Sequence, residues 1–360
     1  MIRFPSKRIT ELLECELPVI QAPMAGANDA AMAVAVASAG AIGSLPCAML
    51  SPDQIESTLL DISSSTNGRI NLNFFCHTPA AQNPAKTKAW HKSLEPYYKE
   101  FNLDPNLKSP TASRTPFDET TCLLVEKHRP RIVSFHFGLP EPALLQRVKD
   151  TGAIVLSSAT TVEEAVWLEA HGADAVIAQG AEAGGHRGMF LATDISSQPG
   201  TFSLIPQVVD AVSIPVIAAG GISDGRGIAA AFALGADGVQ IGTAYLYTPE
   251  ATISRLHREA LSTSDDQSTA MTNVFSGKPA RGISNRVMLE AGPMSDKAPA
   301  FPTAGAALAP LKEAAEAQGS TAFSSLWSGQ SAALCAAMPA ADLTLKLATD
   351  AASHLRGLSL

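Results

Sequence analysis

The sequence predicts a (β/α)8 TIM barrel with a helical C-terminal accessory region. Three observations lead to this fold class. Eight short apolar runs recur before residue 242, and helix-like stretches separate many of them. Glycine–alanine pairs stand directly before several of these runs. The length of 360 residues also exceeds what a barrel of about 250 residues requires, which leaves room for an accessory region.

The eight apolar runs are continuous rather than alternating, which is typical of parallel strands that are covered on both faces. A helix over 29–39 separates the first two strands. The expected strands are Val19–Ala22, Ala41–Leu45, Ile70–Phe75, Ile132–Phe137, Ala153–Ser157, Ala175–Gln179, Val216–Ala219 and Gly238–Ile241.

The glycine–alanine pairs mark the ends of helices, because glycine just past a helix tolerates the left-handed cap conformation. These glycines are Gly40, Gly152, Gly172 and Gly235. Two of the pairs extend into near-copies at 172–176 and 235–239, which indicates a repeated αβ unit. Eight such units close naturally into a barrel.

Two segments depart from this rhythm. Residues 76–118 are too long for an ordinary βα connection, and part of them, 85–101, is expected to form an extra helix. After Leu261 the alternation stops, and the tail is rich in alanine. We therefore expect a barrel over 1–261, with an insertion at about 76–118, and a helical and loop region over 262–360.

Composition excludes several classes of function. The net charge of −8 argues against nucleic-acid binding. No run approaches the 18 or so apolar residues of a membrane span, and the N-terminus is mixed and charged rather than a signal sequence. The five cysteines form no CxxC and no zinc-like cluster with histidine. A cytoplasmic protein with reduced thiols and no metal site is expected.

Candidate functional residues fall at the carboxyl ends of the strands, where barrels of this kind place their sites. Ala22, Pro23 and Met24 stand at the end of the first strand, as an irregular backbone for a flat ring or as an ordinary turn. Asn73, inside the third strand, needs a hydrogen-bond partner, either a ligand ring or the backbone. His136, at the end of the fourth strand, is either a catalytic or a packing residue.

The loop after the sixth strand is the most informative segment. It runs from Gln179 through Gly184 and Gly185 to His186. The glycines allow the backbone to approach a ligand closely, and Gln179 is suited to bond a ring edge. His186 suits acid–base work or anion binding near neutral pH. The alternative is a glycine-rich loop with an incidental surface histidine, and we favour the functional interpretation.

The loops after the seventh and eighth strands predict a phosphate site, because barrels commonly bind phosphate there. Gly220 and Gly221 allow backbone N–H groups to face an anion, Thr243 adds a hydroxyl, and Asp224 is expected to cap the next helix. In the 276–282 stretch, Lys278 and Arg281 either approach an anion or belong to a solvated loop. The remaining histidines have no such setting and are interpreted as surface or structural residues: His77, His91, His128, His171, His257 and His354.

Taken together, these motifs resemble the class I nitronate monooxygenase family. The resemblance covers most of the chain, and its most specific parts are the early Gln-Ala-Pro-Met and the glycine-rich loop that carries His186. It extends into the tail at 298–302 and at 327–330. Some relatives carry tyrosine where Phe301 stands, and Lys312 lies where a basic residue is often found. These features concern the substrate preference more than the cofactor.

The resemblance implies a non-covalent FMN and a reaction in which an alkyl nitronate and O2 give an aldehyde or ketone and nitrite. It makes His186 the residue that binds the nitronate or deprotonates a nitroalkane, and it places His136 in the same pocket. The implied FMN-binding residues are Ala22, Pro23, Met24, Asn73, Gln179, Gly184, Gly185, Gly220, Gly221, Gln240, Ile241, Gly242 and Thr243.

Three alternatives stay open at this point. An FMN-dependent NAD(P)H reductase, acting on enoyl-acyl-carrier protein or on a quinone, shares the same kind of loop. A non-catalytic flavin-binding protein also fits the fold, because function resides in the site rather than in the fold. A barrel that binds a phosphate ligand other than flavin is the third.

Overall fold

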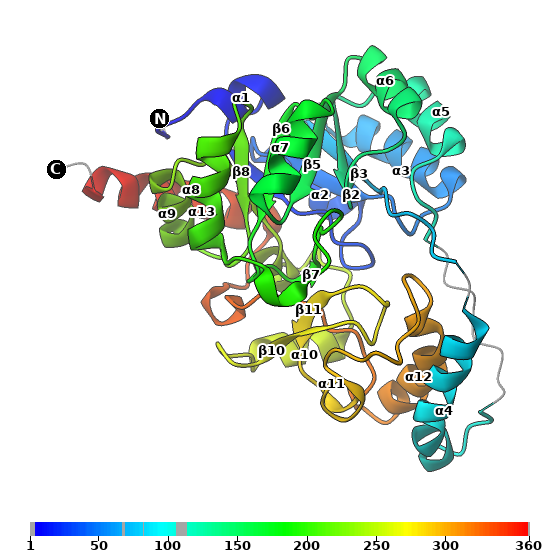
Figure 1. The fold of residues 1–360 in the computed structure, drawn as a ribbon. Coiled ribbons are helices and arrows are strands. Elements are labelled where there is room, and N and C mark those ends of the chain that lie inside the picture. The colour runs from blue at the N-terminus through cyan, green and yellow to red at the C-terminus, as the bar shows by residue number, and fades with distance from the viewer. Residues whose placement is uncertain (1–3, 67–68, 82, 106–113, 359–360) are drawn as a thin grey trace.

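A closed barrel of eight parallel strands forms the centre of the computed structural model, which describes residues 4–66, 69–81, 83–105 and 114–358 (Figure 1). The strands follow the order β1-β9-β8-β6-β5-β4-β3-β2. A parallel bridge between Ile20 and Ile42 joins the first and last strands of this order and closes the barrel. The predicted (β/α)8 TIM barrel is therefore confirmed. Residues 82 and 106–113 of the predicted insertion lie outside the described residues.

All eight predicted strands are present, and their bounds differ from the predicted ones by at most two residues. The barrel strands are β1 (Val19–Gln21), β2 (Gly43–Pro46), β3 (Ile70–Phe75), β4 (Ile132–His136), β5 (Ile154–Ala159), β6 (Ala175–Gln179), β8 (Val216–Ala219) and β9 (Gly238–Ile241). Most of their residues are buried, as expected for strands that pack on a core inside and on helices outside.

Nine helices surround the described part of the barrel or close its ends. They are α1 (Arg8–Leu13), α2 (Ala30–Ser38), α3 (Pro52–Ser65), α5 (Glu119–His128), α6 (Pro142–Asp150), α7 (Val162–Ala170), α8 (Thr201–Ala211), α9 (Gly225–Ala233) and α13 (Ala340–Leu358). The glycines predicted to end helices adopt positive φ, for example +86° at Gly40 and +100° at Gly172. Asp224 caps α9 as predicted, because its side chain accepts from the backbone N–H groups of Arg226 and Gly227.

Helix α1 closes the amino-terminal end of the barrel. Its Ile9 and Leu13 are fully buried and pack with inward-facing strand residues such as Ile177 and Ile217. Figure 1 shows α1 at one end of the barrel and β7 (Gly185–His186) and β11 (Ala280–Ile283) at the other. The amino-terminal end is thus filled with apolar side chains, and the carboxyl end is left for a site.

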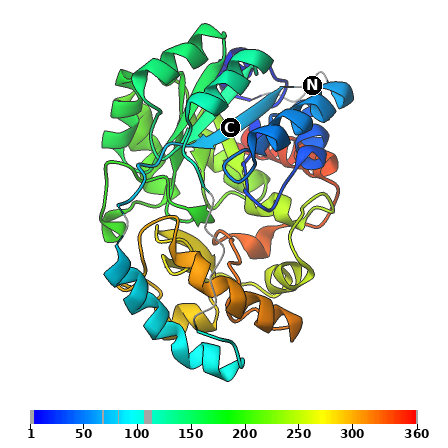
Figure 2. The ribbon, with the colours of Figure 1, turned by 90° about the vertical axis from the view of Figure 1, so that its right-hand side faces the viewer.

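A second unit covers the carboxyl end, as seen from two directions in Figures 1 and 2. It contains β10 (Thr269–Thr272), which pairs with β11, while β11 also pairs with the short β7. Its other elements are α4 (Pro84–Glu100), α10 (Arg255–Ser262), α11 (Arg286–Ala291), α12 (Ala309–Ala317) and the 3-10 helices η1 (Ile195–Ser197), η2 (Thr243–Tyr247), η3 (Ala304–Leu308) and η4 (Ala332–Leu334) where the chain passes between the two units.

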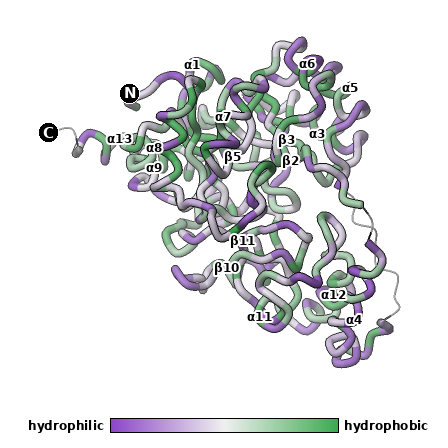
Figure 3. The backbone as a smooth tube through the Cα atoms, in the orientation of Figure 1, coloured by the Kyte–Doolittle hydropathy of each residue, from purple (hydrophilic) through white to green (hydrophobic). Residues whose placement is uncertain are grey.

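The insertion and the tail share one core. Trp90 and Tyr98 of α4 pack against tail residues such as Leu311 and Phe323. Trp90 donates its indole N–H to the carbonyl of Ala304 at 3.0 Å, and the Tyr98 hydroxyl donates to Ala307 at 2.7 Å. Figure 3 shows that much of α4 is hydrophilic. The apolar residues of this helix make the contacts with the tail. The extra helix predicted over 85–101 is confirmed as α4.

The last helix returns to the barrel. Leu343, Leu347 and Ala351 of α13 belong to the same buried cluster as Val36 of α2 and Phe232 of α9. A division of the chain at residue 261 therefore remains a proposal, and the packing of α4 and α13 favours units that are discontinuous in sequence. None of the helices in the described part of the chain is long and apolar enough to cross a membrane.

Candidate active site

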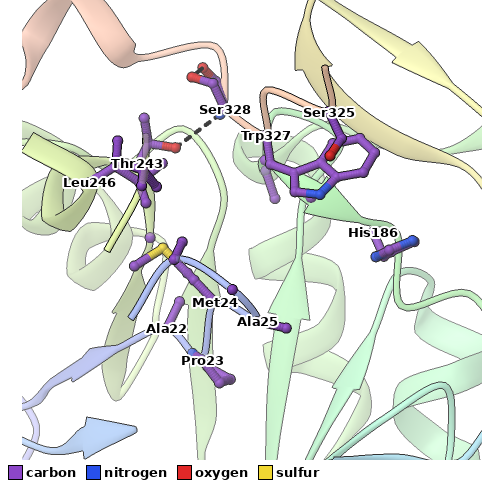
Figure 4. A pocket seen from close by; sticks show the side chains of 18 of the residues that line it. Ala22, Pro23, Met24, Ala25, His186, Thr243, Leu246, Ser325, Trp327 and Ser328 are labelled. Carbon is purple, nitrogen blue, oxygen red and sulfur yellow. Dashed lines mark hydrogen bonds between the residues drawn. The ribbon is translucent and has the colours of Figure 1, made fainter. Parts of the chain in front are cut away.

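A cavity of about 510 Å³ opens at the carboxyl ends of the barrel strands. Fourteen of the fifteen predicted site residues line it. The exception is Ile241 of β9, which is 1% exposed and belongs to a buried apolar cluster of the core. Figure 4 shows His186, Trp327, Ser328 and Thr243 around the space next to Ala22, Pro23 and Met24. The structure therefore brings together residues from six strands and from the tail.

The floor of the cavity is the segment after β1. Ala22 continues the ladder, since its N–H donates to the carbonyl of Ile241 at 2.8 Å. The chain then leaves the sheet, and the N–H of Met24 donates to the side chain of Asn28 at 2.8 Å. This bond fixes an irregular backbone, and the apolar residues Ala22, Pro23 and Met24 line the cavity there, which suits a flat ring.

Two amide side chains of the cavity, Asn73 and Gln240, differ in their hydrogen bonding. Asn73 donates to the hydroxyl of Ser134 at 2.9 Å and, more weakly, to its carbonyl, so its nitrogen serves the neighbouring strand. Gln240 has a buried Oε1 with no hydrogen-bond partner among the described residues. A buried acceptor without a donor costs free energy, so this atom indicates where a ligand donor fits.

The side chain of Gln179 is hydrogen-bonded to the glycine-rich loop and is not available as a free amide in the cavity. Its Nε2 donates to the carbonyl of His186 at 3.0 Å, and its Oε1 accepts from the N–H of Gly188 at 2.8 Å. Both ends of the amide are thus engaged by the loop that follows its own strand. The expected bond from Gln179 to a ring edge stays a prediction, and the structure gives this residue a second task.

His186 lies between a hydroxyl and a wall of aromatic rings. Its Nε2 bonds Ser276 Oγ at 2.8 Å. The ring of Phe301 meets it edge-on with centroids 5.4 Å apart, and Trp327 lies at 5.6 Å. Burial holds the pKa of His186 well below its ordinary value, and the positive charges of Arg114 and Lys278 lower it further. The imidazole is therefore neutral at physiological pH.

His136 supports the loop from below. Its Nδ1 bonds Ser158 Oγ at 2.6 Å, and its Nε2 lies 3.3 Å from the carbonyl oxygen of His186. A carbonyl only accepts, so Nε2 carries the proton and Nδ1 accepts from the serine. Burial lowers the pKa of His136 to about 4, which keeps this arrangement at neutral pH.

Two cations stand close to His186, and the motifs revealed only one of them. Arg114 lies over the ring of Phe301 at 5.5 Å, and Lys278 Nζ lies 4.6 Å from the centroid of Phe137. Among the described residues no carboxylate comes within 4.0 Å of either cation. Within these residues the site therefore holds two cations without a direct ion pair, although the more distant charge of Glu164 offsets part of the lowering of the pKa of Lys278 by burial. Lys278 stood out in the 276–282 stretch, whereas Arg114 lies in the insertion without any motif around it.

Two further histidines belong to the site region. His77, 5% exposed, meets Phe301 edge-on at 4.7 Å, and its Nδ1 has no partner among the described residues. His257 lines the cavity and bonds the carbonyl of Trp327 at 3.2 Å. Burial lowers the pKa of both rings to about 4. The sequence pattern gave no signal for either, because their surroundings come from distant segments.

The other end of the cavity is a glycine-lined cradle. Gly220 and Gly221 have φ of +108° and +69°, which open the backbone after β8. Tail residues complete the cradle: Gly329 donates its N–H to Thr243 Oγ1 at 2.9 Å, and Ser331 Oγ donates to the carbonyl of Gly221 at 2.7 Å. Backbone N–H groups and hydroxyls at this place suit a phosphate. No cluster that could hold a metal ion occurs in the described ranges.

Fold and site together define a (β/α)8-barrel protein with a large, histidine-lined ligand cavity at the carboxyl ends of its strands. A family model described as nitronate monooxygenase matches residues 6–350. The chain is 40% identical over 345 residues to a nitronate monooxygenase of Pseudomonas aeruginosa, and the match covers 95% of this chain and 98% of that protein. The chain therefore belongs to the nitronate monooxygenase family, whose members are flavin-dependent oxidoreductases.

A solved structure agrees with this assignment, and a second shares the fold. The nitroalkane oxidase from Streptomyces ansochromogenes matches with a TM-score of 0.89 at 35% identity, covering 98% of this chain and 99% of that chain. FabK from Thermotoga maritima matches with a TM-score of 0.73 at 24% identity, covering 100% and 99%. At that identity the likeness to FabK shows the fold alone.

Proposed function

We propose that this chain is an FMN-dependent nitronate monooxygenase, which oxidises an alkyl nitronate with O2 to an aldehyde or ketone and nitrite. The observation that carries the proposal is the position of His186, between aromatic rings and the positive charges of Arg114 and Lys278, neither of which is in a direct ion pair among the described residues. Such a pocket favours a compact anion with a small apolar substituent, because charge attraction strengthens as water is excluded. An alkyl nitronate has both parts.

His186 is suited to two forms of substrate. Ser276 Oγ can donate to or accept from Nε2, so the bond between them is compatible with either neutral tautomer. With Nδ1 protonated, the ring donates a hydrogen bond to an oxygen of the nitronate. With Nδ1 unprotonated, the ring accepts the acidic proton of a neutral nitroalkane, and the neighbouring cations favour the anion that results.

FMN, held without a covalent bond, supplies the electron acceptor for this oxidation. We assign its ring to the space next to Ala22–Met24 and Asn73, and its phosphate to the cradle of Gly220, Gly221 and Thr243. The buried Oε1 of Gln240 is an acceptor, so it suits a hydroxyl of the ribityl chain better than the phosphate itself. Gly184 and Gly185 allow the loop to approach from the side of β6.

The test is anaerobic mixing of the purified holoprotein with propionate 3-nitronate, followed by the visible spectrum and then by oxygen. We expect the flavin absorbance to change on mixing, and nitrite to appear once oxygen is admitted. A yellow protein that ignores the nitronate but bleaches with NADH or NADPH would move the assignment to a reductase. A yellow protein that responds to neither would point to a non-catalytic flavin-binding protein.

A further inference from the structure

Two buried arginines grip the loop that carries His186. Arg187 is 1% exposed and Arg281 is 9% exposed. Arg187 donates to the carbonyls of Gln179 at 2.7 Å and Gly180 at 2.5 Å, and Arg281 donates to the carbonyl of Ala181 at 2.9 Å. Three successive carbonyls of the chain leaving β6 thus receive hydrogen bonds from guanidinium groups. We name this set of contacts the arginine clasp.

Neither arginine of the clasp is neutralised by direct contact. In the described part of the chain no carboxylate lies within 4.0 Å of either guanidinium, and the other acceptor of Arg187 is the neutral amide of Gln198 at 2.9 Å. Burial lowers the pKa of Arg187 to about 10 and also lowers the pKa of Arg281, yet both remain charged at neutral pH. The charges of Glu164 and Glu182 offset part of this lowering of the pKa for Arg187, and Glu182 does so for Arg281, so carboxylates beyond direct contact partly compensate both guanidinium groups. A purely apolar packing role still does not account for buried charges that donate to backbone carbonyls.

The clasp lies next to His186 along the chain and across the small sheet. Arg187 is the residue after His186, and its N–H donates to the carbonyl of Pro279 at 2.9 Å. Arg281 pairs with Gly185 in the ladder between β7 and β11, where His186 pairs with Ala280. Together with the amide of Gln179, these contacts tie the start of the loop to its end and to β11.

We infer that Arg187 and Arg281 are positioning residues, which fix the backbone of the glycine-rich loop and thereby the ring of His186. A loop with three glycines among residues 180–185 has much backbone freedom to lose, and hydrogen bonds from a charged fork restrict it strongly. This inference rests on the proposed function only in giving His186 a catalytic task. The restriction of the loop is a property of the folded chain in any case.

The first test is a double-mutant cycle between Arg187→Lys and His186→Asn, measured as nitrite release by the FMN-loaded enzyme. Lysine keeps the charge but loses the fork, so a displacement of His186 is expected to lower kcat by about 10- to 100-fold. In the His186→Asn background the same change is expected to alter kcat less than about twofold, because nothing remains to be positioned. An equal loss in both backgrounds, or no loss in the parent enzyme, would overturn the inference.

The control is Arg129→Lys. Arg129 also donates to a backbone carbonyl, that of Thr151 at 3.1 Å, but it follows α5 at the amino-terminal side of the barrel, so kcat is expected to stay within twofold. If Arg187→Lys does not yield folded protein, Arg281→Lys takes its place in the cycle and decides in the same way.

The second test is hydrogen exchange of the peptide over 179–188, which needs no substrate. The N–H of Gly188, bonded to Gln179 Oε1, should exchange at least about tenfold faster in Arg187→Lys than in the parent enzyme. In Arg129→Lys its exchange rate should be unchanged. Unaltered exchange would refute the clasp. If the parent enzyme releases no nitrite, the proposed function fails, and this measurement still decides whether the clasp restrains the loop.

Discussion

Gly184 is a position in the site where even an added methyl group should disturb the cavity. A methyl group built there would lie 2.5 Å from the backbone nitrogen of Gly329 and 2.6 Å from the carbonyl carbon of Ser328. Carbon contacts need at least about 3.5 Å, so the loop and the tail must separate by about 1 Å. Because both obstacles are backbone atoms, no side-chain rotation relieves the clash.

The size of the effect follows from what this separation breaks. Overpacking of this kind costs about 1–3 kcal/mol of stability. The tail segment that must move includes Gly329, whose N–H is bonded to Thr243 Oγ1 in the phosphate cradle, and the loop that must move carries His186 two residues further on. A 1 Å displacement of a catalytic group lowers turnover by about 100-fold. Gly184→Ala should therefore weaken FMN binding and lower kcat together.

The assay combines three measurements on Gly184→Ala: FMN affinity by flavin fluorescence, turnover by nitrite release, and stability by chemical denaturation. The control is Gly357→Ala in α13, where a methyl group meets nothing within 4 Å. The control should behave like the parent enzyme in all three. If Gly184→Ala bound FMN normally and kept turnover within twofold, the close approach of loop and tail would not govern the site.

Three further predictions concern single residues of the site. His186→Asn should keep FMN bound and reduce turnover by at least about 10-fold, and turnover equal to that of the parent enzyme would remove His186 from the mechanism. Gly221→Asp should raise the Kd for FMN by at least about 10-fold, since it places charge and bulk at the phosphate cradle, and full flavin occupancy would contradict that placement. The free energy of unfolding should fall as the pH drops from about 6.5 to about 4, because the unfolded chain protonates His136 at its ordinary pKa while burial lowers the folded pKa to about 4. The loss is at most about 3 kcal/mol from this group, and denaturation curves should show a shallower fall in His136→Gln; an equal slope would assign the effect to other groups.

The barrel could be read from the chain because its signals are local. Each strand is a largely apolar run, and four of the helices that precede strands (α2, α6, α7 and α9) end at a glycine with positive φ, as at Gly152 and Gly235. Burial on both faces favours apolar residues at successive positions of a strand rather than at alternate ones, so the pattern stands in the sequence itself. The order of the strands along the chain then placed the loops of β6, β8 and β9 at one end.

The small sheet over the cavity was not predictable in this way. Strand β7 has two residues, Gly185 and His186, and it exists because β11, almost a hundred residues later, pairs with it. A strand of this length has no internal pattern, and its stability comes wholly from a partner distant in sequence. The same holds for the tail residues Gly329 and Ser331, which complete the phosphate cradle.

The sequence by itself determined the fold class, the position of the site and the residues that converge on it, because strand patterns and loop residues are visible within short segments of the chain. Only the tertiary structure decided what each side chain does there. In the folded chain Ile241 is buried in the core, and Gln179 is hydrogen-bonded to the loop that follows its own strand. Burial lowers the pKa of His186, and Arg114 and His77 lie close enough to it for their charges to lower that pKa further. Hydrogen-bond partners, burial and local charge are set by segments that meet only in the folded chain, and these determine the chemistry of the histidine.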